Sequence, residues 1–326
     1  MALIDSFGRK ISYLRLSVTD RCNLRCVYCM PPEGVRKLRH EDILSYEELL
    51  LLAETAVSIG IEKIRVTGGE PLVRKGILGF LGNLSSIPGL RQLVLTTNGM
   101  LLPEMAGGLR SAGVQRLNIS LDSLEVETFA RITRGGDLNK VLQGIRIAEE
   151  TGFPIKLNMV VMRGINDAEV VDFARLTLDK PHTVRFIEYM PTIKAPDWRA
   201  FVVPGEEIIR RIAGVYRLEK LERDDRLSGP STDYRIDGAA GAIGIITPVS
   251  SHFCGECNRI RVTSSGMARG CLFDDTEYDL KMILRNGNRA AIVDALREIV
   301  GRKPGRGRIS DGDSARKPFD MSKVGG

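Results

Sequence analysis

The first two-thirds of this chain repeats one unit, a short apolar strand followed by a helical stretch, six times. The expected strands are Ser12–Val18, Lys63–Thr67, Gln92–Thr97, Arg116–Leu121, Ile155–Val161 and Thr183–Tyr189. Strands that alternate with helices pair in parallel through right-handed crossovers. A doubly wound sheet and a full or partial barrel both satisfy this pattern. Both place their chemistry at the carboxyl ends of the strands.

The clearest expected helix spans Tyr46–Ile59. Ser45 and Glu48 have the spacing of a capping box, and Gly60 follows as a stop signal. A second helix is expected over Asp167–Leu178, after a turn at residues 164–166.

After Pro191 the pattern changes to Pro, Gly and short strand-like segments. The expected elements there are the strands Ala242–Val249 and Arg259–Thr263 and the helices Asp279–Arg285 and Arg289–Val300. We therefore expect a first domain at residues 1–221 and a smaller C-terminal α+β region at residues 222–301. Residues 302–326 have the composition of a flexible tail and end in Gly325 and Gly326.

Polar motifs follow four of the expected strands at the point where each strand ends. Cys22 follows the first strand, and the others are residues 67–71, 96–99 and 120–123. Because the carboxyl ends of parallel strands meet at one edge of the sheet, these motifs predict a single site there.

All six cysteines fall into two groups of three, far apart in the sequence. The groups are Cys22, Cys26 and Cys29, then Cys254, Cys257 and Cys271. A closed zinc site takes four ligands, and so does a four-iron cube held only by protein. Three thiolates on a cube leave one iron open to a small molecule. A zinc site stays open as an alternative for the second group, with His252 as its fourth ligand.

Composition limits the class of protein. Residues 1–10 include Asp5 and lack the apolar stretch of a signal peptide, and no run is long enough to cross a membrane. We expect a cytoplasmic protein whose thiols stay reduced. The net charge of +6 is spread along the chain and 6% of residues are aromatic, which does not favour nucleic-acid binding. The three histidines form no nucleophile or triad pattern.

Two arginines stand out by their position inside strands. Arg15 and Arg65 alternate with apolar neighbours, so both are expected on one face of a buried sheet. A buried arginine needs an anionic partner, and a triphosphate would serve.

The first cysteine group, with Tyr28 before its last cysteine, resembles the signature of radical S-adenosylmethionine enzymes. The resemblance implies a full or partial (β/α) barrel, and we take the fold class as α/β, a partial (β/α)6 TIM-type barrel. It also implies that a [4Fe–4S] cluster binds S-adenosylmethionine and cleaves it to a 5′-deoxyadenosyl radical. Residues 68–71 resemble the family's GGEP motif, whose backbone and glutamate hold the methionine amino group. The family's cosubstrate contacts fall on Tyr28, Gly69, Ser120 and Met190.

The second cysteine group, with Arg259 and Arg261 beside it, is similar to one branch of that superfamily, the GTP 3′,8-cyclases of molybdenum cofactor biosynthesis. The similarity extends over nearly the whole chain, including residues 13–22 and the terminal Gly-Gly. It implies a second [4Fe–4S] cluster that binds guanine. The implied GTP contacts are Arg15, Arg65, Thr96, Lys156, Arg259, Ile260 and Arg261. In the family the Gly-Gly tail reaches toward the active site.

The resemblance implies a lyase that converts GTP to (8S)-3′,8-cyclo-7,8-dihydroguanosine 5′-triphosphate. The adenosyl radical takes the hydrogen of ribose C3′, and the carbon radical attacks guanine C8. Cys22, Cys26, Cys29, Arg259 and Arg261 form the implied catalytic set. The implied partners are GTP, S-adenosylmethionine, a low-potential electron donor, and a cyclic pyranopterin monophosphate synthase that takes the product. Neither nucleic acid nor membrane is expected, and a homodimer is one alternative for the oligomeric state.

Two other functions remain open at this point. One is a different radical enzyme with an auxiliary cluster, acting on a peptide or another nucleotide. The other is a zinc or nucleic-acid-binding module without enzymatic activity.

Overall fold

A curved sheet of parallel strands forms the centre of the computed structural model, which describes residues 2–35, 38–190, 197–222, 229–251 and 254–306. Its first six strands are β1 (Tyr13–Ser17), β2 (Lys63–Thr67), β3 (Gln92–Thr97), β4 (Arg116–Ser120), β5 (Ile155–Val161) and β6 (Thr183–Glu188). They are neighbours in chain order and pair in parallel, so the six predicted strands are confirmed. Every residue of β1 and β2 is buried, although both strands carry charged side chains between their apolar ones.

The C-terminal region continues this sheet at both edges. The strand β10 (Arg259–Val262) pairs in parallel with β1, and β9 (Ala242–Ile246) pairs in parallel with β6. The outer strands are antiparallel: β7 (Leu218–Lys220) and β8 (Thr232–Ile236) beyond β9, and β11 (Met267–Arg269) and β12 (Tyr278–Asp279) beyond β10. The described strands run in one sheet from β12 to β7, and these two are not paired, so the barrel is open.

The division that we expected after residue 221 does not separate two sheets. It falls just after β7, which pairs with β8 from the other side of the division. The C-terminal residues therefore build both rims of the sheet that the first domain begins.

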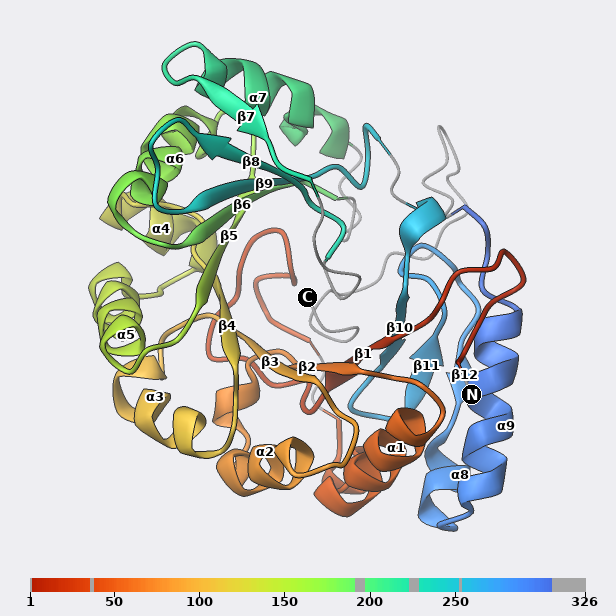
Figure 1. Ribbon diagram of the computed structural model, residues 1–326. Helices are drawn as coiled ribbons and strands as arrows, with labels where there is room; N and C mark the ends of the chain where they lie inside the picture. The colour runs from red at the N-terminus through yellow and green to blue at the C-terminus, as the bar shows by residue number, and fades with distance from the viewer. Residues whose placement is uncertain (1, 36–37, 191–196, 223–228, 252–253, 307–326) are drawn as a thin grey trace.

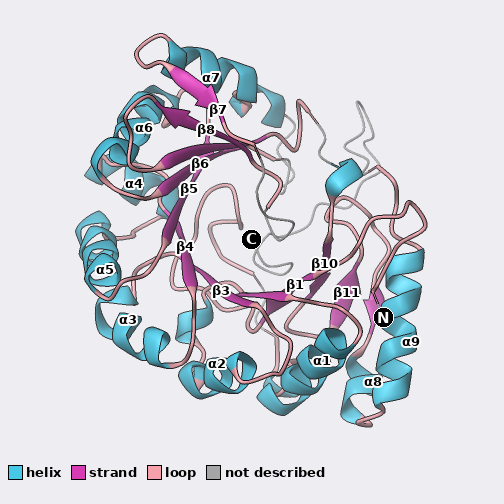
Figure 2. Ribbon diagram, in the orientation of Figure 1, coloured by secondary structure: helices cyan, strands magenta, loops and turns pink. Residues whose placement is uncertain are grey.

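Helices cover the convex face of the sheet (Figures 1 and 2). Those that follow β1 to β6 are α1 (Tyr46–Ser58), α2 (Ile77–Ser85), α3 (Leu102–Ser111), α4 (Val126–Thr133), α5 (Leu138–Glu150), α6 (Val170–Asp179) and α7 (Gly205–Ala213). Near the C-terminus, α8 (Lys281–Arg285) and α9 (Arg289–Gly301) contact α1. The main apolar core fills the layer between these helices and the strands.

Local sequence signals account for the helix ends. The capping box predicted for α1 is present: the Ser45 side chain accepts from the Glu48 amide, and the Glu48 carboxylate accepts from the Ser45 amide. The helix predicted at Asp167 begins with a 3₁₀ turn at Asp167–Glu169, and α6 proper starts at Val170. In the part of the chain that the structure describes, no helix has both the length and the apolar character needed to cross a membrane.

The expected tail begins inside the fold. Lys303 is buried, 3% exposed, in the segment directly after α9. Residues 307–326, with the Gly-Gly end, lie outside the described residues.

Candidate functional site

One pocket opens inside the curve of the sheet, at the carboxyl ends of the parallel strands. Its wall contains all six cysteines, so the structure brings the two distant groups to one cavity. The other predicted residues in the wall are Arg15, Tyr28, Arg65, Gly69, Thr96, Ser120, Met190, Arg259 and Arg261. The single site predicted from the strand ends is therefore present.

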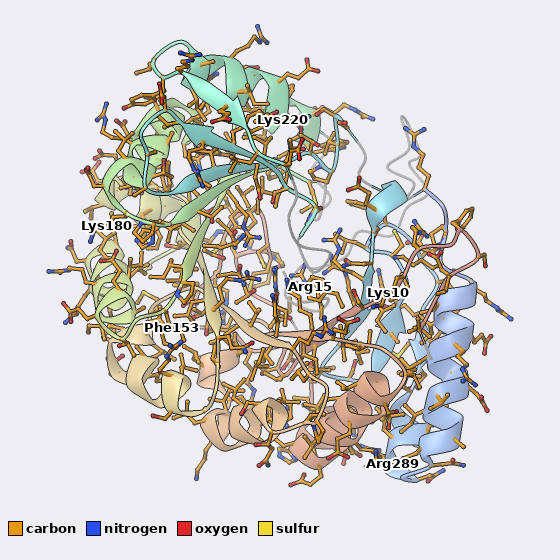
Figure 3. All side chains as sticks on the ribbon, viewed as in Figure 1. Lys10, Arg15, Phe153, Lys180, Lys220 and Arg289 are labelled. Atoms are coloured by element: carbon orange, nitrogen blue, oxygen red, sulfur yellow. The ribbon has the colours of Figure 1, made fainter. Side chains whose placement is uncertain are left out.

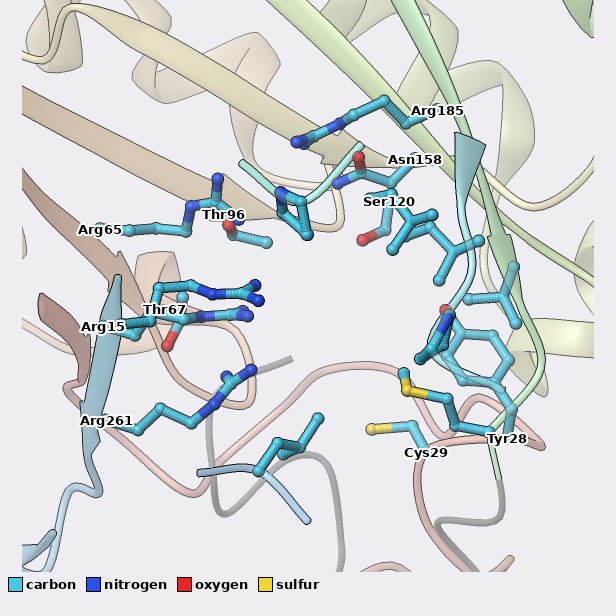
Figure 4. A pocket seen from close by; sticks show the side chains of 18 of the residues that line it. Arg15, Tyr28, Cys29, Arg65, Thr67, Thr96, Ser120, Asn158, Arg185 and Arg261 are labelled. Atoms are coloured by element: carbon cyan, nitrogen blue, oxygen red, sulfur yellow. The ribbon is translucent and has the colours of Figure 1, made fainter. Parts of the chain in front are cut away.

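A row of three arginines forms one side of the pocket. Arg261 on β10 lies opposite Arg15 on β1, and Arg15 lies opposite Arg65 on β2. Since residues in register on parallel strands point the same way, all three side chains enter the pocket together (Figure 4). Figure 3 shows Arg15 inside the curve of the sheet, whereas Lys180 and Arg289 lie at the outer surface.

This arginine row is deeply buried. Arg261, Arg15 and Arg65 are 7, 8 and 9% exposed. Burial lowers the pKa of Arg15 well below its usual range, and the neighbouring Arg261 guanidinium lowers it further. Burial and Arg259 likewise lower the pKa of Arg261 to about 10. Among the described residues of the pocket wall, five are arginines and none is acidic, so an anionic ligand is needed to balance the charge.

The first cysteine loop lies across the pocket from the arginine row. Its backbone is tied to the end of α4, where Arg25 and Val27 donate to the carbonyls of Thr133 and Ile132 at 3.0 and 2.9 Å. The Tyr28 hydroxyl donates to the buried Asp122 carboxylate at 2.8 Å, which fixes the ring between Cys26 and Cys29. Burial, followed by the Asp122 charge, raises the pKa of the Cys26 thiol well above its ordinary value. A bound metal would displace that proton.

The glycines of the GGEP motif allow a close backbone approach. A Cβ at Gly69 would lie 2.3 Å from the Arg21 carbonyl oxygen, and one at Gly68 would lie 2.8 Å from the Thr19 oxygen. Both glycines line the pocket and are packed against the segment that leads into Cys22. The motif thus joins the end of β2 to the first cysteine loop.

The glutamate of this motif joins two loops at the edge of the pocket. Glu70 is 1% exposed. It accepts hydrogen bonds from the Leu72 amide, the Asn98 amide and the Thr97 hydroxyl at 3.1, 2.7 and 2.9 Å. Glu70 therefore connects the loop after β2 to the loop after β3, and two of its partners, Thr97 and Asn98, line the pocket.

We expect Glu70→Gln to change the pH dependence of stability. Burial raises the pKa of Glu70 to about 7, above its ordinary 4.5, so folding takes up a proton between these values. The wild type should therefore lose roughly 2 kcal/mol of stability relative to the glutamine variant as pH rises from about 5.5 to 8. Thermal unfolding of both proteins at pH 5.5 and pH 8 measures this. Glu127→Gln, at an exposed position on α4, is the control, and a Glu70 variant with the same pH profile as wild type would contradict the expectation.

The second cysteine loop starts in a 3₁₀ turn at Cys254–Glu256 and continues into β10. Burial opposes ionisation of Cys257, but Arg259 and Lys303 outweigh it and lower the pKa of the thiol to about 6. Among the described residues, no group of three His, Cys, Asp or Glu side chains is arranged to hold a single metal ion. His252, the fourth ligand of the zinc alternative, lies outside the described residues.

Two predicted substrate contacts do not line the pocket. Ile260 is 1% exposed and its side chain belongs to the apolar core, because it points opposite to Arg259 and Arg261 along β10. Only its backbone could face a ligand. Lys156 is on the same face of β5 as Asn158, which does line the pocket, but lies two residues deeper. Burial and Arg185 lower the pKa of Lys156 to about 8.

Sequence reasoning missed two polar residues of the pocket wall, Asn158 and Arg185. Arg185 lies between the buried Val184 and Phe186 of β6, the same in-strand pattern that singled out Arg15, so this signal could have found it. Its guanidinium donates to the Asn118 side chain at 2.6 Å, and burial lowers its pKa to about 9.

Several buried polar atoms of this wall have no hydrogen-bond partner within the described part of the chain. They include Arg65 Nε, Thr67 Oγ1, Thr96 Oγ1, Asn158 Oδ1 and Arg185 Nε. Since buried polar groups are almost always satisfied in folded proteins, these atoms indicate a polar ligand in the pocket. Donors and acceptors on both sides of the cavity fit a ligand with phosphates and a polar base.

Comparison with known proteins is consistent with this geometry. The family model described as Radical SAM superfamily matches residues 16–177, and the model described as Molybdenum Cofactor Synthesis C matches residues 182–309. The boundary between these two models falls before β6, earlier than the division expected after residue 221.

A GTP 3′,8-cyclase of Geobacter sulfurreducens is 62% identical over the whole of both chains. Another, from Peptoclostridium acidaminophilum, is 46% identical, with 99% of this chain and 98% of the relative covered. Among solved structures, Streptococcus suis SuiB matches 90% of this chain and 69% of its own, with a TM-score of 0.58 and 12% identity. That likeness shows the fold alone. The chain belongs to the radical SAM superfamily and, within it, to the family of the GTP 3′,8-cyclases.

Proposed function

We propose that this protein is a radical S-adenosylmethionine enzyme that converts GTP to (8S)-3′,8-cyclo-7,8-dihydroguanosine 5′-triphosphate, the first step of molybdenum cofactor biosynthesis. The observation that carries the proposal is the composition of the pocket wall. Two groups of three cysteines and five arginines, with no acidic residue among the described wall residues, face one cavity. No single metal ion needs such a wall, but two open clusters and a triphosphate do.

Cys22, Cys26 and Cys29 would hold the first [4Fe–4S] cluster. When bound, this cluster supplies the electron that splits S-adenosylmethionine and gives a 5′-deoxyadenosyl radical. The residues around the loop fit that cosubstrate. Gly69 packs against the backbone that leads into Cys22 and lines the pocket, and Ser120 and Met190 reach the same wall. Asp122 holds the Tyr28 ring in place next to the cysteines.

Cys254, Cys257 and Cys271 would hold the second [4Fe–4S] cluster, which takes the guanine of GTP. The arginine row begins on β10, beside the second cysteine group, and would bind the triphosphate. Guanidinium groups suit this task because each offers paired donors to phosphate oxygens and keeps its charge at neutral pH. Thr96, Asn158 and Arg185 supply further polar atoms to the nucleotide.

Part of the remaining wall is apolar. Leu24, Val160, Ile187, Ile246, Leu272 and Phe273 contribute to it. An apolar wall excludes water from a carbon-centred radical and limits the positions that the ribose can take. The chain's own contribution is therefore to bind, orient and enclose the two nucleotides.

Because its thiols must stay reduced, we place the enzyme in the cytoplasm. A low-potential electron donor and transfer of the product to a cyclic pyranopterin monophosphate synthase belong to the same proposal.

Anaerobic turnover tests the function. Protein with reconstituted clusters, supplied with GTP, S-adenosylmethionine and dithionite, should give 5′-deoxyadenosine and the cyclised nucleotide in about equal amounts. Arg259→Ala should weaken GTP binding by roughly 10- to 100-fold, the worth of hydrogen bonds to a charged group, and leave cosubstrate cleavage intact. Cleavage without any cyclised nucleotide from GTP would favour a radical enzyme with another substrate.

A further inference from the structure

Lys303 was expected in a flexible tail, but its ammonium group lies against the second cysteine loop. Only 3% of the residue is exposed. Its Nζ donates to the Cys257 sulfur at 3.4 Å, to the Arg259 carbonyl oxygen at 3.0 Å and to the Gly270 carbonyl oxygen. An ammonium group carries three hydrogens, so these three partners use all of its donors.

The three partners belong to both arms of the loop. Cys257 and Arg259 lie on the arm that leads into β10, and Gly270 directly precedes Cys271 on the returning arm after β11. The two arms are joined through the β10–β11 pair. The β10–β11 pair is the first link between the two arms. Lys303 adds a second link, close to Cys257 and Cys271.

The surrounding chain fixes the position of Lys303. Gly270 has no side chain, and a Cβ there would lie 3.4 Å from the Lys303 Cβ and 3.2 Å from the Ile299 carbonyl oxygen. Arg9, paired with Asp5 at 2.6 Å, donates to the carbonyl oxygens of Cys254 and Pro304 at 2.6 and 2.8 Å. The segment after α9 and the first arm of the loop are thus held by the same arginine.

We propose that Lys303 is a positioning residue of the second cluster, which holds a positive charge between the two arms and against a ligand sulfur. This inference rests on the proposed function, since it requires a cluster on Cys254, Cys257 and Cys271. Reduction adds a negative charge to the cluster, and a nearby buried cation stabilises that charge. Hydrogen bonds to ligand sulfurs and net charge are known determinants of cluster potential. Lys303 therefore makes the second cluster easier to reduce.

The test measures the midpoint potential of the second cluster alone. The parent is the full chain with Cys22, Cys26 and Cys29 replaced by alanine, reconstituted with iron and sulfide under anaerobic conditions. Electron paramagnetic resonance follows the reduced cluster during a redox titration. Lys303→Gln keeps two hydrogen-bond donors without the charge. We expect its reduction equilibrium to be about tenfold less favourable, which is a fall of 59 mV for a one-electron couple.

Lys303→Arg keeps the charge and should stay close to the parent potential. Lys281→Gln is the matched control, because Lys281 is a partly buried lysine of the same region that pairs with Asp42 away from the pocket. An unchanged potential in Lys303→Gln with full iron content would overturn the proposal. Loss of the cluster in both Lys303 variants, with Lys281→Gln intact, would also overturn it, because the fit of lysine rather than its charge would then be decisive. A parent that binds no iron would instead contradict the proposed second cluster itself.

Discussion

Replacing Cys26 with alanine is expected to abolish both 5′-deoxyadenosine release and nucleotide cyclisation, whereas replacing Cys257 should abolish cyclisation alone. The two residues belong to the two cysteine groups of the same pocket wall. Cys26 lies in the loop beside Gly69, Tyr28 and Ser120, where the cosubstrate would bind. Cys257 lies next to Arg259 and Lys303, at the nucleotide side. Each loss should exceed the 10- to 100-fold effect typical of removing an outer-shell partner of a metal.

The test determines the iron content of the Cys26 and Cys257 variants and the products that each forms. Each should retain roughly half of the wild-type iron, since each keeps one intact group of three cysteines. The chain has no cysteine outside the two groups, so Ser111→Ala, on α3 away from the pocket, serves as the control for a small truncation. Cyclisation by the Cys257 variant at the wild-type rate, or zinc in place of iron, would contradict the assignment.

The first six strands of the sheet could be predicted because their local composition indicates burial. β2, β3 and β5 have the predicted bounds, β4 and β6 end one residue earlier than predicted, and β1 is one residue shorter at both ends. β2 to β6 combine β-branched with other residues, which suits strands covered on both faces. The position of the site followed from the same reasoning, because carboxyl ends of parallel strands share an edge.

The partners of the C-terminal strands could not be predicted. Periodicity indicated a strand at Arg259–Thr263, but nothing local specifies that β10 pairs with β1, about 240 residues earlier. That pairing aligns Arg261 with Arg15 and Arg65 and so creates the arginine row. The expected division after residue 221 has the same origin: a change in composition marks where the repeating unit ends, not where the sheet ends.

For Glu70 and Lys303, the sequence did not predict the surroundings of the individual side chain. The motif around Glu70 identified the correct loop, but the direction of its carboxylate depends on amides after β3, which only the fold brings near. Lys303 lies in a stretch rich in Gly, Arg and Lys, whose composition indicates exposure. Its burial results from the packing of α9 against α1 and of the following segment against the second cysteine loop.

A last expected result concerns the loss of folding stability that the buried arginine row causes. Arg15→Met should raise the stability of the nucleotide-free protein and at the same time weaken GTP binding. Arg15 is the central member of the row, 8% exposed, with like charges opposite it on both neighbouring strands. Replacing a buried charged group with an apolar one of similar volume often stabilises by roughly 1–4 kcal/mol. Loss of its hydrogen bonds to phosphate should cost about 1.5–3 kcal/mol of binding, or roughly 10- to 150-fold in affinity.

Thermal unfolding without nucleotide and calorimetric titration with GTP measure the two effects in the same preparation. Arg235→Met, at an exposed position on β8, is the control and should change neither. A lower unfolding temperature together with unchanged GTP affinity would show that Arg15 supports the fold instead of the ligand. Opposite signs for the two effects are expected of a residue whose charge serves binding, because burial of the charge costs stability in the nucleotide-free protein whereas its contacts with phosphate add affinity.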